Sequence, residues 1–364
     1  MNQQKHPFYL KLSLILISLA LICVALIYGK DIILPILFAI LLANILLPVT
    51  QYLAKRRFNK SLSIFIPLFL AIIVGGGILY FLSSQIMNFM DDVPALKERV
   101  NEVSHSFQVW FRKTTAITIT RQNAYITETV KDFKENSPGL VGSTFDSLAG
   151  ILVYIILIPL YTFLILYYKQ NIKVFLISVF SNGSDKEVTD VLTGSTKVAQ
   201  QYLTGLFIET TLVFILNMSG FLILGIKYAI FLALFAALMN LIPYVGILIA
   251  NIFCMLITLA SSDSISDVVW VGIILAVVQF LDNNFGMPLI VGNKVRINAL
   301  VTVIGVIVGG ALCGIPGMFL AIPGLAVLKV IFDKVPELQP WGILLGDNTS
   351  NTKSQQLIDN TQKL

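Results

Sequence analysis

Long hydrophobic segments with almost no charged residues alternate with short polar stretches along most of the chain. Several segments have the length of one membrane-spanning helix, which needs about 20 mainly apolar residues. They cover residues 11–29, 31–53, 61–82, 147–168, 204–226 and 268–289. Because a helix satisfies its own backbone hydrogen bonds inside a bilayer, the pattern predicts an all-α polytopic membrane protein with about six full spans.

Two further hydrophobic runs, 228–260 and 299–333, do not fit this scheme. Each is too long for one upright helix and too short for two full spans. Helix-breaking residues interrupt both runs: Pro243 and Gly246 in the first, and Gly309, Gly310, Gly314, Pro316 and Gly317 in the second. Such breaks leave peptide groups unpaired at membrane depth, where only protein atoms or a water-filled cavity can satisfy them. Transporters place substrate sites at such breaks, so the chain is a candidate membrane transporter.

The distribution of basic residues favours one topology for the broken runs. Lys and Arg cluster at residues 55–60, which predicts that this turn and both termini are cytoplasmic. If the two runs are re-entrant hairpins that open from opposite faces, Lys294 and Arg296 also lie on the cytoplasmic side. Each hairpin and the span before it would then be one half of an inverted repeat. The alternative is eight plain spans, which would leave Lys294 and Arg296 outside.

The same pattern divides the chain into five parts. Three N-terminal spans precede an extracytoplasmic segment whose apolar residues recur at helical spacing, as in amphipathic helices. A fourth span and a cytoplasmic helix lead to the transport core with its two broken hairpins, and a polar tail follows. The expected bounds are 1–82, 83–146, 147–203, 204–335 and 336–364.

Composition supports the membrane class and excludes several others. The chain is 56% hydrophobic and 12% charged, against about 25% charged residues in soluble domains. The net charge of +5 is explained by basic cytoplasmic loops, and no basic stripe with interleaved aromatic residues indicates nucleic-acid binding. No HExxH, GxSxG or P-loop pattern indicates an enzyme or an ATP-driven pump. Transport is therefore expected to be secondary or passive, with no cofactor and no metal site.

Asp282 and Asn283 end the sixth expected span, and Gln279 lies three residues earlier on the same helix face. A carboxylate with amides facing a cavity can bind a proton, a cation or a polar solute. The alternative is that Asp282 is solvated at the membrane interface.

Glu209 lies about one turn inside the fifth span, among apolar neighbours. A carboxylate in lipid is costly unless it is protonated or paired, so Glu209 should face protein, where it could carry a proton. A structural hydrogen bond to Gln201 or Thr210, or snorkelling to the interface, explains the residue equally well.

Asn240 and Tyr244 flank the break at Pro243 and Gly246. An amide and a phenol beside a broken helix are suitable ligands for a polar solute. The alternative is that Asn240 only satisfies carbonyl groups that the proline frees.

Three stretches of the chain resemble the autoinducer-2 exporter family, also called PerM-like permeases. The first is Ala237 to Gly246, the second Gln279 to Val295, and the third Val308 to Pro323. The order of spans and the long outer segment are also similar, so the resemblance covers about residues 10–335. The chain departs from the family pattern at Ile247–Leu248, where a proline is usual, and at Asn298–Ala299, where His-Pro is usual.

The resemblance implies a bacterial inner-membrane protein that exports a small polar molecule such as autoinducer-2. Some members are similar to sodium–proton antiporters, and a homo-oligomer, with a pentamer as one candidate, is implied. The leading hypothesis is an ion-coupled exporter with the lipid bilayer, a small polar solute and H⁺ or Na⁺ as its partners. Alternatives are a Na⁺(Li⁺)/H⁺ antiporter that uses Asp282 or Glu209, and a non-transporting scaffold that binds partners through 83–146.

Overall fold

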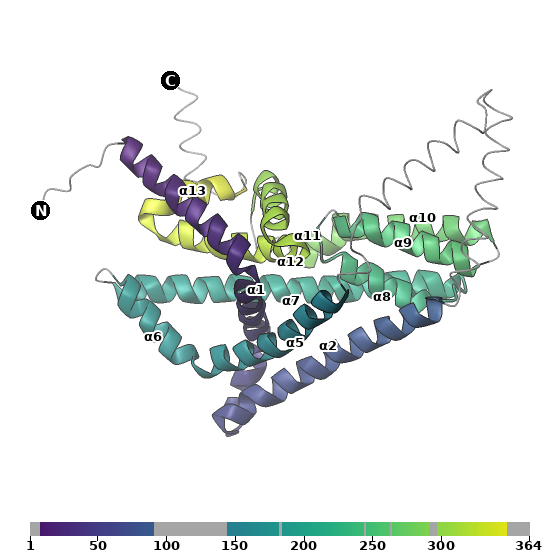
Figure 1. Cartoon of the computed structure of the whole chain (residues 1–364), viewed down its shortest axis with the longest axis horizontal. Coiled ribbons are helices and arrows are strands. Elements are labelled where there is room, and N and C mark those ends of the chain that lie inside the picture. The colour runs from purple at the N-terminus through teal and green to yellow at the C-terminus, as the bar shows by residue number, and fades with distance from the viewer. Residues whose placement is uncertain are drawn as a thin grey trace, which may run out of the picture.

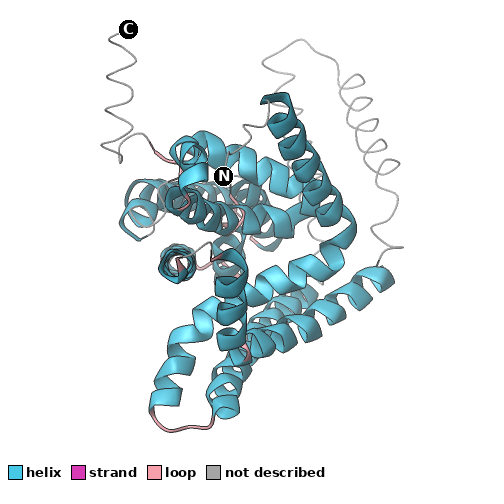
Figure 2. Cartoon of the chain, turned by 90° about the vertical axis from the view of Figure 1, so that its left-hand side faces the viewer, coloured by secondary structure: helices cyan, strands magenta, loops and turns pink. Residues whose placement is uncertain are grey.

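The computed structural model of the chain describes residues 8–90, 144–181, 184–243, 245–262, 264–290 and 297–347. These residues form helices joined by short loops, and the described ranges contain no strand, only an isolated bridge between Ile297 and Gly346 (Figure 2). The principal helices are α1 (Phe8–Lys55), α2 (Lys60–Met90), α5 (Thr144–Tyr167), α6 (Lys169–Phe180), α7 (Asp185–Ile223), α8 (Ala229–Met239), α9 (Val245–Ser261), α10 (Ile265–Leu281), α11 (Met287–Ile290), α12 (Ala299–Lys334) and α13 (Gln339–Leu345). A π-helical turn follows α10 at Asp282–Gly286, and a 3₁₀ turn precedes α13 at Pro336–Leu338. The predicted all-α class is confirmed.

Five of the described helices are long and apolar enough to cross a membrane, and the bent pair α5–α6 is a sixth candidate. The first two expected spans are not separate helices in the structure, because residues 11–53 lie within the 48-residue helix α1. Two spans would require the chain to reverse between them, whereas α1 is one helix that bends without folding back (Figure 1). A single crossing by α1 would carry the N-terminus to the face opposite the 55–60 turn. The predicted extracytoplasmic segment lies largely outside the described residues.

Helix α7 is the axis of the molecule and joins the two broken runs (Figure 1). Its 39 residues include both the expected cytoplasmic helix and the fifth span. The C-terminal half packs against α8 and α10, and the N-terminal half packs against α12. Gly194 on the N-terminal half contacts Val330 of α12, while Gly220 near the other end approaches Ile274 of α10.

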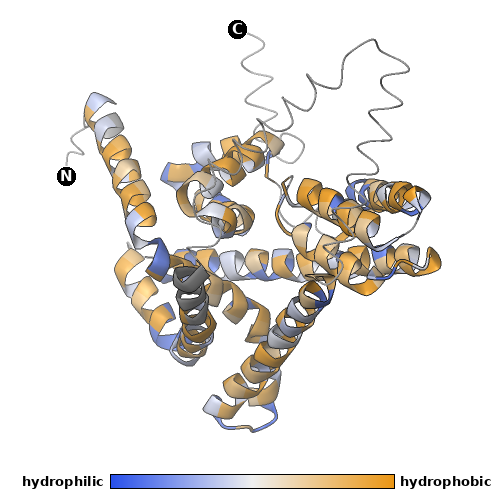
Figure 3. Ribbon diagram, turned by 45° about the vertical axis from the view of Figure 1, so that its right-hand side comes forward, coloured by the Kyte–Doolittle hydropathy of each residue, from blue (hydrophilic) through white to orange (hydrophobic). Residues whose placement is uncertain are grey.

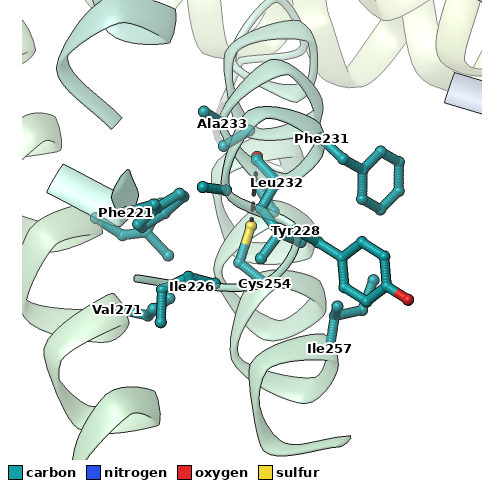
Figure 4. Packing of buried hydrophobic residues seen from close by; sticks show 13 residues of the cluster. Phe221, Ile226, Tyr228, Phe231, Leu232, Ala233, Cys254, Ile257 and Val271 are labelled. Atoms are coloured by element: carbon teal, nitrogen blue, oxygen red, sulfur yellow. Dashed lines mark hydrogen bonds between the residues drawn. The ribbon is translucent and has the colours of Figure 1, made fainter. Parts of the chain in front are cut away.

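The first broken run folds as a hairpin of two short helices, α8 and α9, called hairpin 1 below. The chain turns at residues 240–243, and the two arms run antiparallel with Phe235 beside Phe253 at 4.2 Å between ring centroids. The Cys254 thiol donates to the Leu232 carbonyl oxygen at 3.6 Å across the hairpin (Figure 4). Both residues are fully buried, and Phe221 from α7 packs into the same cluster.

The second broken run, α12, is also a hairpin, called hairpin 2 below. Gly314 at its tip has φ +65° and ψ −151°, a conformation that is essentially restricted to glycine. A Cβ atom added to Gly309 would lie 2.5 Å from the Gly317 carbonyl oxygen, and one added to Gly305 would lie 2.5 Å from Leu325 Cδ1. Residues so far apart in a straight helix could not meet, so the two arms are antiparallel. The break is narrower than predicted, because Gly314 is the one residue with non-helical backbone inside α12.

The hairpin form expected for both runs is therefore present, whereas their placement in a membrane and their inverted repeat remain predictions. Hairpin 1 packs between α7 and α10, and hairpin 2 packs on α7 and α1, where Phe319 stacks on Phe38 at 5.8 Å.

Helices α2 and α5 and the C-terminal half of α1 form a second packed unit below α7 in Figure 1. Ala43, Leu46, Ile64 and Leu166 are buried where these helices meet. At one end of this unit, the Lys60 ammonium lies 4.2 Å from the centre of the Tyr167 ring. This contact brings the basic turn between α1 and α2 next to α6, as a shared cytoplasmic face would require.

Most residues along the described helices are hydrophobic (Figure 3), and many large apolar side chains are exposed. Large apolar residues such as Ile73, Ile156 and Phe207 are more than half exposed. A soluble protein rarely exposes apolar patches of this extent, whereas a surface in contact with lipid requires them.

Candidate functional site

One face of α7 is buried along its length, with positions four residues apart facing the other helices. Gly205, Glu209, Val213, Asn217 and Phe221 make up this stripe. Two of the five are polar, and both are almost fully buried: Glu209 is 8% exposed and Asn217 is 2% exposed. At a rise of about 1.5 Å per residue, these two side chains leave α7 about 12 Å apart.

Asp282 is buried at the start of the π-helical turn that follows α10. Its carboxyl group is 4% exposed, and Oδ1 receives no hydrogen bond from an N–H or hydroxyl group of the described residues. A Cβ atom at Gly286 would lie 2.5 Å from this oxygen, so the glycine leaves the space that Asp282 Oδ1 occupies. Isolated π-turns are frequent at functional sites, and the sequence carried no pattern that predicts this one.

Asp282 and Glu209 face each other across the contact between α7 and the π-turn. Their carboxyl groups are near enough to interact electrostatically. A hydrogen bond between them would require one proton on the pair, because two ionised carboxylates have only acceptors. The structure thus joins two residues that the sequence offered as alternatives, and Glu209 is buried at this contact.

Asn240 connects hairpin 1 to the carboxyl pair. It caps α8, and its side-chain Nδ2 donates to Asp282 Oδ2 at 3.2 Å. The chain then turns at Pro243, and α9 begins so close to α8 that a Cβ atom at Gly246 would collide with the Met239 carbonyl oxygen. Tyr244, the other predicted ligand at this break, lies outside the described residues.

Gln279 and Asn283 are bonded to each other rather than to the carboxyl pair. Gln279 Nε2 donates to Asn283 Oδ1 at 3.0 Å on the outer side of α10. Gln279 also lines a small cavity, described next, whereas Asn283 is exposed. The breaks of hairpin 2 are not part of this site, because the atoms nearest to Gly309, Gly310 and Gly317 belong to hairpin 2 itself.

A cavity of about 10 Å³ lies between α7, hairpin 1 and α10. Its lining includes four amide side chains: Asn217, Asn240, Asn251 and Gln279. Asn217 and Asn251 are not among the site residues that the sequence predicted. Their common feature is an amide inside an apolar run, a signal too frequent in membrane helices to identify a cavity.

The described site therefore combines a pair of carboxyl groups that can hold a proton with amides that can bind a cation or a polar solute. No group of three or more His, Cys, Asp or Glu side chains within the described ranges could hold a metal ion. The chemistry that these residues support is reversible binding.

Comparison with known proteins agrees with this chemistry. The chain matches the family described as "AI-2E family transporter" over residues 15–337. It is 25% identical over 323 residues to the Bacillus subtilis protein named "Putative transport protein YrrI", covering 83% of this chain and 86% of the relative. It is 27% identical to "Putative transport protein YueF" of the same species, covering 84% of each. Over 55% of this chain and 57% of the relative, it is 24% identical to "Putative permease PerM" of Escherichia coli. The chain is a multi-pass membrane protein that belongs to the AI-2E transporter family.

Proposed function

We propose that the protein is a secondary transporter that exports a small polar metabolite or signalling molecule in exchange for protons. The observation that carries this proposal is the pairing of Glu209 with Asp282 beside the break of hairpin 1. Two facing carboxyl groups favour the binding of one proton, since both ionised forms would repel each other in a site of low dielectric.

Asn240 connects the protonation of the carboxyl pair to the position of hairpin 1 in this proposal. Its amide donates to Asp282 Oδ2, so it stabilises the ionised form of this carboxyl group. When the pair gains or loses a proton, the strength of that bond changes, and hairpin 1 is held more or less firmly at its tip. A differential interaction of this kind is what allows a proton to bias one conformation over another.

A Na⁺(Li⁺)/H⁺ antiporter is the second candidate function. The observation in its favour is the buried Asp282 Oδ1, a carboxylate oxygen to which no described N–H or hydroxyl group donates. Hard cations prefer such oxygen ligands. In this case Na⁺ and a proton would compete for the same carboxyl pair.

We place the protein in the bacterial inner membrane as a homo-oligomer, with the 55–60 turn and the C-terminus in the cytoplasm. Lys60 of the turn lies against Tyr167, two residues before the start of α6 at Lys169, which supports this orientation. The N-terminus needs its own accessibility measurement, because an unbroken α1 that crosses once would place it outside.

Transport by the purified protein in proteoliposomes tests the function. An imposed pH gradient should drive the movement of a solute found by screening metabolites and of protons in the opposite direction. Sodium-dependent proton flux without any metabolite would favour the antiporter instead. If no solute moves, and if residues 83–146 capture a partner protein, the scaffold hypothesis would replace both.

A further inference from the structure

The amide-lined cavity next to the carboxyl pair has oxygen atoms without donors. Asn217 is 2% exposed, and its Oδ1 receives no hydrogen bond from any described residue. A buried amide oxygen without a partner costs free energy, on the order of 1–3 kcal/mol. A bound species that completes this oxygen's coordination would remove the cost.

Three more amide side chains line the same cavity: Asn240, Asn251 and Gln279. Asn240 donates through Nδ2 to Asp282, and Gln279 donates through Nε2 to Asn283. These bonds direct one N–H of each amide away and leave its carbonyl oxygen to accept or to coordinate. Amide side chains from several helices thus line one small space.

The size and charge of the cavity restrict its occupant. A volume of about 10 Å³ is close to the minimum that holds one water molecule, so a metabolite does not fit. A water molecule has two donors and could satisfy only two of the oxygens. A divalent cation is usually bound by carboxylates, and this lining has none.

We propose that this cavity binds one dehydrated monovalent cation through the side-chain oxygens of Asn217, Asn240, Asn251 and Gln279. Val213 and Val278 also line the cavity and are buried together with Ala237. Asn240 contacts both sites, so the cation lies one amide away from Asp282 and stabilises its negative charge. The site would hold a cation beside the proton-binding pair of the transporter proposed above and rests on that function for its purpose, but its occupancy can be measured without transport.

Equilibrium dialysis of the purified protein against radioactive sodium, at constant ionic strength set with choline chloride, tests the proposal. The wild-type chain should bind one sodium ion per chain, and excess unlabelled Na⁺ should displace it. Asn217→Leu, which removes the orphaned oxygen and keeps the side chain's size, should weaken this binding at least tenfold. Asn284→Leu is the matched control, because Asn284 is exposed on the π-turn and donates to the Phe280 carbonyl. This variant should bind as the wild type does.

Gln279→Leu is a second variant for the case that Asn217→Leu does not fold. Gln279 is a proposed ligand of the same cation and is less buried than Asn217. The Gln279 variant too should weaken sodium binding. Unchanged affinity in the Gln279 variant and in any folded Asn217 variant, or no displaceable sodium on the wild-type chain, would overturn the cation site. Binding without any transport in proteoliposomes would leave the cation site standing and count against the transporter function alone.

Discussion

Hairpin 1 and hairpin 2 have the same origin in the sequence and different environments in the fold. Both are apolar runs broken by proline and glycine. Hairpin 1 is enclosed by α7 and α10, and more than half of the residues in α8 are buried, including Phe231, Leu232 and Ala233. Hairpin 2 has four buried residues in its 36: Val306, Gly317, Pro323 and Ala326. The arms of hairpin 2 are held together mainly by their own glycine contacts, whereas surrounding helices fix hairpin 1.

This difference indicates separate roles for the two hairpins. Asn240 at the tip of hairpin 1 contacts Asp282, so this hairpin carries part of the site within a packed core. Elements that move are drawn from regions with few buried contacts. Hairpin 2 fits that description better, and its mouth is closed by α13, where Asn298 N donates to the Leu345 carbonyl at 2.9 Å.

The largest expected effect is a loss of stability when one buried side chain is removed from the core of hairpin 1. Leu232→Ala removes a fully buried side chain and should lower the free energy of unfolding by about 2–5 kcal/mol. Leu328→Ala is the control in hairpin 2, where Leu328 is 44% exposed, and it should change stability by less than about 0.5 kcal/mol. Reversible unfolding in mixed micelles measures both. Equal losses would remove the distinction between the two hairpins.

A smaller effect is expected from closing the space between the arms of hairpin 2. Gly317→Val places a side chain against the Gly309 backbone and should destabilise the protein by about 1–3 kcal/mol. Gly324→Val lies on the same arm, where an added Cβ meets nothing within 4 Å, so it should be close to neutral. The same unfolding assay applies. If the two valine variants behave alike, the arms are not in contact in the way described here.

The smallest effect is expected at the mouth of hairpin 2. Lys329 pairs with Asp333 at 2.7 Å and also donates to the Gly342 carbonyl of α13 at 3.3 Å. Lys329→Met should cost less than about 1 kcal/mol, because the pair is partly exposed. Hydrogen exchange of α13 should nevertheless increase, because one of its contacts to hairpin 2 is lost. Unchanged exchange in α13 would show that Lys329 does not hold it.

The sequence predicted those features that depend on local chemistry. Pro243 and Gly314 mark the tips of the two hairpins. Proline cannot continue a helix, and glycine can adopt the positive φ that a sharp reversal requires. The helical class followed from the apolar runs alone. The expected boundary between the spans 11–29 and 31–53 is not a break in the structure, because helix α1 continues through it.

The pairing of Glu209 with Asp282 could not be predicted, because it depends on the antiparallel register of α7 and α10. The two residues are far apart in the chain, and each alone has an ordinary explanation. The π-turn that presents Asp282 has no local signature either. Long-range register, rather than composition, is what assembles the site.

The central claim is that Glu209 and Asp282 act as one proton-binding unit. Its most direct test is proton flux driven by a pH gradient in proteoliposomes that contain Glu209→Gln or Asp282→Asn, with Asp185→Asn at the exposed start of α7 as the matched control. Both site variants should reduce flux to the level of empty liposomes, and the control should retain wild-type flux. Wild-type flux in either site variant would contradict the claim that the two carboxyl groups work as a pair.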